Sequence, residues 1–175
     1  SYVFYGFWDW RFLSLILISS LMDYFLALAI SQTPETNGRK RKFMLVLSLV
    51  LNLGFLGFFK YYNFFVESFV STFALFGKEF NYSPLNIILP VGISFYTFQS
   101  LSYTLDVYFK KMEPTRKLVN FLAFVSFFPQ LVAGPIERAK NLLPQFEDLK
   151  SFDYHSARSG LLLIVFGLFK KIMIA

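Results

Sequence analysis

The sequence predicts an all-α, polytopic integral membrane protein: a multi-helix bundle with a re-entrant helix–loop segment. Of its 175 residues, 55% are hydrophobic and 21% are aromatic, whereas only 16% are charged. Soluble domains average about 45–50% apolar and about 25% charged residues, so this composition indicates a membrane protein. Several apolar stretches reach the length of about 20 residues that a helix needs to cross the bilayer core. Two prolines and a glycine interrupt another apolar stretch, and this interruption predicts the re-entrant segment.

The expected elements form one partial membrane domain over residues 1–175. Residues 12–30 make the first span, and Asp23 within it needs a polar partner that the sequence does not identify. The second span is 43–59. Its helix can extend to residue 76, because no glycine or proline intervenes, and residues 43–76 would then measure about 51 Å. The remaining elements are a third span at 85–109, the re-entrant segment at 118–136, an amphipathic segment at 141–156 and a last helix at 159–175.

The positive charges predict how the spans are oriented. Lys and Arg cluster in loops 39–42 and 110–117, whereas loop 77–84 carries one Lys and one Glu. Two spans separate the basic loops, so both loops fall on the same side, and the Lys/Arg excess marks that side as cytoplasmic. We therefore expect a multi-pass protein whose partner is the lipid bilayer. Nucleic acid is not expected, since both clusters adjoin apolar spans.

A stripe of polar side chains runs along the third span. Polar residues inside a span cost free energy unless they face protein or water, so each is a candidate functional residue. A spacing of three or four residues places them on one helical face. They could line a channel for a polar substrate, or they could form interhelical hydrogen bonds, and we favour packing. The stripe comprises Tyr96, Gln99, Ser102, Tyr103 and Asp106. Asp106 could also form a solvated ion pair with Lys110 or Lys111 at the membrane edge.

The segment FFPQLVAGPIERAK, residues 127–140, carries two helix breakers in an apolar context. Proline removes a backbone donor and clashes with the preceding turn. Irregular backbone survives at membrane depth only inside protein or beside a water-filled cavity. Residues 118–128 would span about 16 Å as a helix, roughly half a bilayer. We therefore expect a half-helix that enters, turns and returns, with a Pro-kinked complete span as the alternative. The motif residues are Pro129, Gln130, Gly134, Pro135 and Arg138.

These stretches together resemble the membrane-bound O-acyltransferase family. The resemblance is carried by LPVGISFYTFQSLSYTLDVYF (89–109), FFPQLVAGPIERAKNLLPQF (127–146) and GLFKKIMIA (167–175). SYVFYGFWDWRFLSLILISSLMDY, residues 1–24, also looks like the early part of the bacterial branch that includes the membrane subunit of alginate O-acetyltransferase. The likeness implies many helices around a funnel, to which the double-proline motif contributes a re-entrant wall.

The resemblance also implies an activity. It implies transfer of an acetyl group from a cytoplasmic donor to hydroxyls of an extracytoplasmic polysaccharide, such as alginate or peptidoglycan, with a partner protein outside the membrane. The donor, acetyl-CoA or an acyl-carrier thioester, would be a substrate, and no bound cofactor or metal is expected. The alternatives are D-alanyl transfer to teichoic acid by the same fold, and a polytopic transporter or flippase.

The catalytic histidine that the resemblance implies has no match in this chain. It belongs to a Trp-His stretch, and the one histidine present, His155, lies in the polar sequence SFDYHSARS. We therefore assign no catalytic residue here and expect His155 at a surface or interface. Position 1 is Ser rather than Met, and an apolar run reaches Ala175. We expect a piece of a longer protein whose catalytic histidine follows residue 175.

Overall fold

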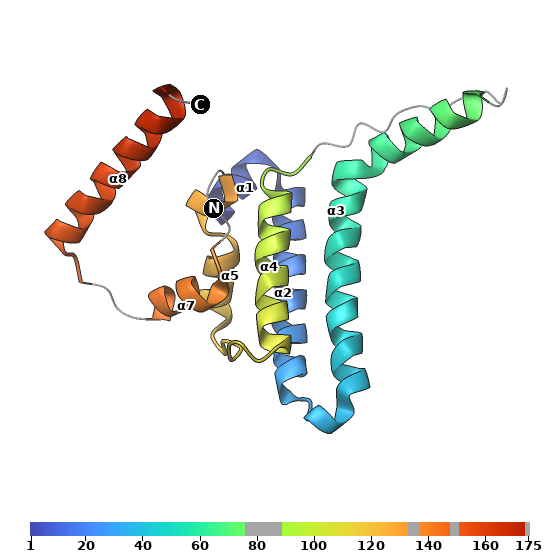
Figure 1. Ribbon diagram of the computed structural model, residues 1–175, viewed down its shortest axis with the longest axis horizontal. Helices are drawn as coiled ribbons and strands as arrows, with labels where there is room; N and C mark the ends of the chain where they lie inside the picture. Colours follow the sequence, from blue (N-terminus) through green and yellow to red (C-terminus); the bar gives the residue numbers. More distant parts are fainter. Residues whose placement is uncertain (76–88, 133–136, 148–150, 174–175) are drawn as a thin grey trace.

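The computed structural model describes residues 1–75, 89–132, 137–147 and 151–173, and all regular secondary structure in these ranges is helical (Figure 1). The all-α prediction is confirmed for them. The elements in chain order are α1 (Tyr2–Trp8), α2 (Trp10–Gln32), the 3-10 turn η1 (Glu35–Asn37), α3 (Gly38–Leu75), α4 (Ile93–Tyr108), α5 (Leu118–Val125), α6 (Phe128–Val132), α7 (Ala139–Glu147) and α8 (Tyr154–Met173).

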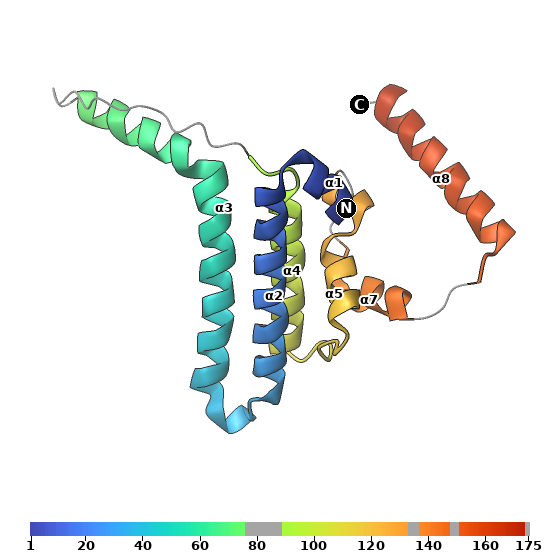
Figure 2. The ribbon, with the colours of Figure 1, turned by 180° about the vertical axis from the view of Figure 1, so that it is seen from behind.

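Helices α2, α3 and α4 pack against one another and form the central bundle (Figures 1 and 2). α2 begins after Asp9, whose carboxylate accepts a hydrogen bond of 2.9 Å from the Arg11 backbone N–H, as an N-cap does. Two helical stretches, Trp10–Gln32 and Glu35–Phe73, are long and apolar enough to cross a membrane. They contain the first two predicted spans, 12–30 and 43–59.

Helix α3 includes nearly all of the predicted extension to residue 76, since it continues to Leu75. A straight helix of 38 residues would be about 57 Å long, nearly twice the thickness of a bilayer core. The C-terminal part of α3 turns away from the bundle instead of continuing along it (Figures 1 and 2). The long uninterrupted pattern in the sequence therefore gives one helix with a change of direction.

Helix α4 begins at Ile93, later than the predicted start at residue 85. Residues 89–92 are not helical, and 85–88 lie outside the described residues. Gly92 has φ +73, and a Cβ at this position would lie 2.6 Å from the Leu131 carbonyl oxygen. Glycine tolerates this left-handed conformation and lets the two backbones approach. The helix of 16 residues is about 24 Å long, shorter than the predicted span.

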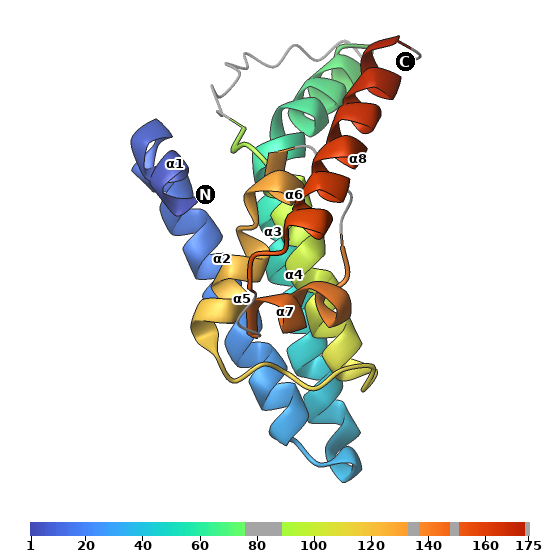
Figure 3. The ribbon, with the colours of Figure 1, turned by 90° about the vertical axis from the view of Figure 1, so that its left-hand side faces the viewer.

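The predicted re-entrant stretch 118–136 is not a single continuous helix. α5 ends at Val125 and α6 begins at Phe128, so the helix is broken before Pro129 (Figure 3). Proline has no N–H to donate to a carbonyl four residues earlier, but it is tolerated in the first turn of a new helix. The Ser126 hydroxyl donates a 2.8 Å hydrogen bond to the Leu122 carbonyl at the end of α5. Residues 133–136 lie outside the described residues, so the return of the chain stays a prediction.

The last two helices differ from the predicted boundaries. The amphipathic stretch 141–156 contains most of α7 and the beginning of α8, and the loop residues 151–153 lie between the two helices. α8 begins at Tyr154 rather than at residue 159, because the Asp153 carboxylate caps its first turn. No residue of α8 is buried, and α8 stands apart from the other helices (Figure 1).

The two basic clusters, 39–42 and 110–117, lie at the same end of the bundle, as the charge pattern predicts, but residues 39–42 form the first turn of α3 and not a loop. Arg41 Nη2 donates a 2.9 Å hydrogen bond to the Tyr108 carbonyl, and Lys110 forms an ion pair with Glu35. These contacts join the start of α3 to the end of α4. The alternative of an ion pair between Asp106 and Lys110 or Lys111 is not formed among the described residues, and η1 brings Glu35 to Lys110 instead.

Candidate functional site

The polar stripe of α4 is turned into the protein. Tyr96, Gln99 and Tyr103 are almost completely buried, and Asp106 is 9% exposed. Ser102 departs from the pattern because it is half-buried and its hydroxyl donates to the Gln99 carbonyl of its own helix, at 2.8 Å. Four of the five predicted stripe residues are therefore buried, whereas Ser102 is half-buried and its hydroxyl bonds to a carbonyl of its own helix.

Gln99 connects the stripe to the broken segment. Its Nε2 donates one hydrogen bond of 2.7 Å to Gln130 Oε1 and another of 2.7 Å to the Phe124 carbonyl oxygen. Gln130 is 7% exposed, so both carboxamides are shielded from solvent. The Phe124 carbonyl belongs to the last turn of α5, and it also accepts a 3.3 Å hydrogen bond from the Phe127 N–H just after that helix. We call Gln99, Gln130 and the Phe124 carbonyl the glutamine cluster.

The other residues of the double-proline motif are less closely involved. Pro129 is exposed, and its role is to break the helix beside Gln130. Arg138 is exposed immediately before α7, where its carbonyl accepts hydrogen bonds from Asn141 and Leu142. Gly134 and Pro135 lie outside the described residues. Within the described part of the motif, Gln130 alone joins the glutamine cluster.

Tyr96 lies one turn before Gln99 on the same helical face. Its hydroxyl is buried and has no hydrogen-bond partner among the described residues. An unpaired buried polar group of this kind costs about 1–3 kcal/mol. Tyr5, on α1, donates its hydroxyl to the Val91 carbonyl just before α4 and thereby fixes α1 next to this region. The Tyr96 hydroxyl is thus a polar group in an otherwise apolar interior, placed near the broken helix.

The C-terminal half of the stripe contacts the loop that connects α4 to α5. The Tyr103 hydroxyl accepts a 3.2 Å hydrogen bond from the Thr115 N–H, and its ring packs against Phe121 at a centroid distance of 4.6 Å. The Asp106 carbonyl accepts a hydrogen bond from Lys111 N–H at the end of α4. These contacts order the loop and fit the packing role that we favour for this part of the stripe.

A second polar cluster supplies the partner that Asp23 needs. The Asp23 carboxylate is completely buried and accepts a 2.6 Å hydrogen bond from the Ser48 hydroxyl. Asn52 Nδ2 donates to both carboxylate oxygens, at 2.9 and 2.8 Å. Ser100 of α4 also lies beside this carboxylate. We call Asp23, Ser48, Asn52 and Ser100 the aspartate cluster.

The sequence contained a signal for this cluster. Ser48 and Asn52 are four residues apart in the most apolar part of the second predicted span, so they share a helical face. Ser100 belongs to a second buried polar face of α4 that also includes Thr97 and Thr104. The polar stripe predicted from the sequence is one polar face of this helix, and the face with Thr97, Ser100 and Thr104 is a second one that was not predicted.

His155 lies on the surface, as predicted. It is exposed in the first turn of α8, where its backbone N–H donates a hydrogen bond of 3.1 Å to Asp153 Oδ1. Hydrogen bonds from Ser156, then from the His155 backbone, hold the pKa of Asp153 below its ordinary value. This arrangement is a helix N-cap that involves the backbone N–H of His155 and not its imidazole.

The glutamine cluster can bind and orient but cannot take up a proton at neutral pH. Carboxamides donate and accept hydrogen bonds without changing charge. A carboxamide pair and a free hydroxyl therefore suit the wall of a polar chamber, and acid–base chemistry would need another group.

The chain is similar over its full length to curated bacterial proteins. It is 36% identical to the peptidoglycan O-acetyltransferase of Helicobacter pylori and covers 37% of that protein. It is 38% identical to the probable alginate O-acetylase AlgI of Azotobacter vinelandii and to that of Pseudomonas aeruginosa, covering 34% and 33% of them. The chain thus spans about a third of the length of these relatives. No protein-family model and no solved structure matches it.

Proposed function

Because the chain is homologous over its whole length to bacterial O-acetyltransferases of the membrane-bound O-acyltransferase family, we propose that it forms part of an enzyme that acetylates a cell-envelope polysaccharide. The acetyl group comes from a cytoplasmic donor and goes to hydroxyls of an extracytoplasmic polymer such as alginate or peptidoglycan. This similarity is the observation that carries the proposal.

The buried polar groups support a chamber at the broken helix. At the helix break the Phe124 carbonyl accepts a 3.3 Å hydrogen bond from the Phe127 N–H, and polar backbone groups of this kind need good partners inside an apolar bundle. Gln99 donates a second, shorter hydrogen bond to this carbonyl and holds Gln130 at the same point. In the proposed enzyme this pair keeps the broken segment fixed against α4, so that the chamber wall has a defined shape.

The chemistry explains why the chamber needs such a wall. A base removes the proton of the sugar hydroxyl, the hydroxyl oxygen attacks the thioester carbonyl carbon, and the thiolate leaves from the tetrahedral intermediate. Hydrogen-bond donors stabilise the developing oxyanion best in a site from which bulk water is excluded. We propose that the base is a histidine of a Trp-His stretch that this chain does not contain, because His155 lies in no such stretch. The residues of this chain position the wall of the proposed chamber.

The charge pattern supports the orientation that we propose. The end of the bundle with the basic clusters faces the cytoplasm of a bacterial inner-membrane protein, since Lys and Arg accumulate there. The donor, acetyl-CoA or an acyl-carrier thioester, approaches from this end. The acceptor polysaccharide and an acetyl-transfer partner protein contact the opposite end.

Gln130→Ala tests the chamber in cells that depend on this protein for polymer acetylation. Ester-linked acetate is released from the isolated polymer by mild alkali and measured by chromatography. We expect about a tenfold loss of polymer-bound acetate with normal amounts of protein in the membrane. The change removes Gln130 Oε1, which accepts a hydrogen bond from the buried Gln99 side-chain amide. Gln145→Ala is the matched control, because Gln145 is exposed on α7 and donates only to the Asn141 carbonyl.

His155→Ala completes the test and should leave acetylation unchanged. Complete loss of acetylation in His155→Ala would overturn our assignment of the base. Normal acetylation in Gln130→Ala would show that the glutamine cluster is not part of the chamber. A polymer that carries D-alanine esters instead of acetate would overturn the proposed donor group.

A further inference from the structure

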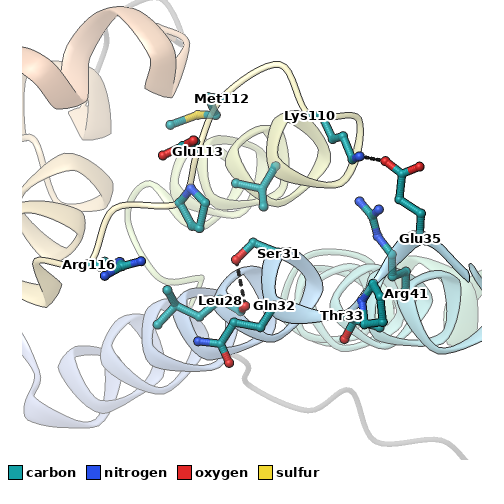
Figure 4. A pocket seen from close by; sticks show the side chains of 13 residues that line it. Leu28, Ser31, Gln32, Thr33, Glu35, Arg41, Lys110, Met112, Glu113 and Arg116 are labelled. Carbon is teal, nitrogen blue, oxygen red and sulfur yellow. Dashed lines mark hydrogen bonds and ion pairs between the residues drawn. The ribbon is translucent and has the colours of Figure 1, made fainter. Parts of the chain in front are cut away.

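A cavity of about 670 Å³ lies at the end of the bundle where the two basic clusters meet (Figure 4). The end of α2, the start of α3, the end of α4 and the connection to α5 surround it. Its lining belongs to neither the glutamine cluster nor the aspartate cluster. The charged residues of the lining are Glu35, Arg41, Lys110, Glu113 and Arg116.

Arg41 is the one cation of this lining that is buried. It is 9% exposed, its Nη2 donates to the Tyr108 carbonyl at 2.9 Å, and its guanidinium lies 5.5 Å from the Tyr108 ring centre. Its Nε–H is buried and has no acceptor among the described residues. Neither of the ion pairs formed in the described part of the chain involves Arg41.

A buried guanidinium without a counter-ion is costly, because a charge removed from water needs a partner of opposite charge. One carbonyl and one aromatic face satisfy only part of the group. The orientation of Arg41 at the cavity therefore calls for an anion on the cavity side. Phosphate oxygens match the donors of arginine in geometry and in charge.

The remaining charges of the lining leave an excess of positive charge. Arg116 lies across the cavity from Arg41 (Figure 4). Lys110 and Glu35 pair with each other at the exposed rim, so their charges cancel. Of the lining charges outside this pair, Glu113 is negative, whereas Arg41 and Arg116 are positive.

Lys110 is held at this rim by the way α4 ends. Lys110 N–H bonds to the Val107 carbonyl at 3.1 Å and Lys111 N–H to the Asp106 carbonyl at 2.8 Å, the pattern of a Schellman motif. The position after the cap is usually glycine, but here Lys110 adopts φ +58. The motif thus places a cationic side chain at the mouth of the cavity.

Exposed apolar side chains next to these cations indicate the source of the anion. Phe43 and Phe109 are 66% and 59% exposed, and each is close in sequence to a cation of the cavity. Phe109 and Tyr108 also line a smaller hollow of about 230 Å³ that shares Arg41 and Lys110 with the cavity. Exposed phenylalanines suit acyl chains, and basic pockets between helices at a cytoplasmic membrane face suit anionic headgroups.

We propose that this cavity binds the phosphate group of an anionic phospholipid. The Arg41 Nε–H donates to a phosphate oxygen, Arg116 supplies the second positive charge, and the acyl chains extend along the apolar side chains beside Phe43 and Phe109. The inference does not depend on acetyl transfer, because it rests on the charges and apolar surface at this end alone.

Native mass spectrometry of the protein in dodecyl maltoside tests the site. Phosphatidylglycerol and zwitterionic phosphatidylcholine are titrated separately, and inorganic phosphate and coenzyme A are added as soluble competitors. We expect tight retention of phosphatidylglycerol and weak retention of phosphatidylcholine. Arg41→Gln should weaken phosphatidylglycerol binding by about tenfold or more, as expected for a charged hydrogen bond. Arg39→Gln is the matched control, because Arg39 is exposed in the same turn of α3 and does not line the cavity.

Arg116→Gln provides a second variant in case Arg41 is needed for folding. The Arg116 backbone carbonyl, not its side chain, accepts the Tyr24 hydroxyl, so this change leaves that contact in place. We expect it to weaken phosphatidylglycerol binding as well. Equal losses in Arg39→Gln and in the cavity variants would show diffuse attraction and overturn the site. Displacement of phosphatidylglycerol by inorganic phosphate or coenzyme A would reassign the cavity to a soluble phosphate.

Discussion

The aspartate cluster and the glutamine cluster are both buried in an apolar bundle, yet they satisfy different groups. In the aspartate cluster, Ser48 and Asn52 of α3 donate to the Asp23 side chain of α2, and Asn52 also donates to the Ser48 carbonyl of its own continuous helix. In the glutamine cluster, Gln99 of α4 donates to a backbone carbonyl as well as to Gln130. One cluster joins continuous helices, and the other exists where a helix is broken.

This difference suggests different roles: the aspartate cluster stabilises helix packing, and the glutamine cluster shapes the proposed site. Hydrogen bonds between unbroken helices fix how the helices pack and are worth about 0.6 kcal/mol each on average in membranes. A broken helix has carbonyls that require outside donors, and such backbone persists at membrane depth beside protein or a cavity. We therefore expect changes in the aspartate cluster to act on stability, and changes around the glutamine cluster to act on acetyl transfer beyond their effect on stability.

Gly92→Ala should have the largest effect, because it separates α4 from α6. The new Cβ would lie 2.6 Å from the Leu131 carbonyl oxygen, at a residue with φ +73. Left-handed conformation and overpacking together should cost about 3 kcal/mol. The midpoint of thermal unfolding in detergent and the polymer-bound acetate should both fall.

Gly54→Ala is the control for this change. Gly54 lies within α3, and a Cβ there would meet nothing within 4 Å. Alanine is the better helix former by about 1 kcal/mol, so stability should stay equal or rise. If Gly92→Ala behaved like Gly54→Ala, the close approach of α4 to α6 would not matter for the site.

Asp23→Ala should have the next largest effect and should act on stability. It removes the acceptor of the Ser48 hydroxyl and the Asn52 amide, and both are buried. The Ser48 hydroxyl and one Asn52 N–H would lose their acceptor, while Asn52 keeps its bond to the Ser48 carbonyl. This loss should cost about 2 kcal/mol, seen as a lower unfolding midpoint. Asp23→Asn keeps one acceptor oxygen and should lose less. Acetylation that fell while the unfolding midpoint stayed constant would place the aspartate cluster in the site and remove the distinction between the clusters.

The sequence predicts the members of these clusters better than their pairing. The spacing along residues 96–106 predicts a polar face, and its members other than Ser102 are buried. The helix break lies at residues 126–127, before the double-proline motif, whereas residues 129–132 of the expected turn are helical. The bond between Gln99 and Gln130 could not be predicted, because it depends on how α6 packs against α4. Asp23 was recognised as needing a partner, but the choice of Ser48 and Asn52 depends on the register between α2 and α3.

The differences at helix ends have local causes. The late start of α4 follows from Pro90 and Gly92, because Gly92 adopts a left-handed conformation just before the helix begins. Lys110 pairs with Glu35 because η1 turns the chain back at the start of α3, and no local pattern shows this. Composition and periodicity thus predict which residues are buried, and the turns decide which of them meet.

Tyr96→Phe and Tyr103→Phe form the finest test, since each removes one hydroxyl from the same helical face. The Tyr96 hydroxyl has no partner in the described part of the chain, so its loss should leave stability unchanged or raise it by about 1 kcal/mol. The Tyr103 hydroxyl accepts from the Thr115 N–H, so its loss should lower stability by about 1 kcal/mol.

Of these two variants, Tyr96→Phe should lower polymer-bound acetate more, although Tyr103→Phe should lower stability more. If the Tyr96 hydroxyl serves the chamber beside the glutamine cluster, Tyr96→Phe lowers acetylation without lowering the unfolding midpoint. Tyr103→Phe should lower acetylation only in proportion to the protein that remains folded, because Tyr103 holds the loop between α4 and α5. Full acetylation in Tyr96→Phe would make its unpaired hydroxyl a feature of packing and confine the site to Gln99 and Gln130.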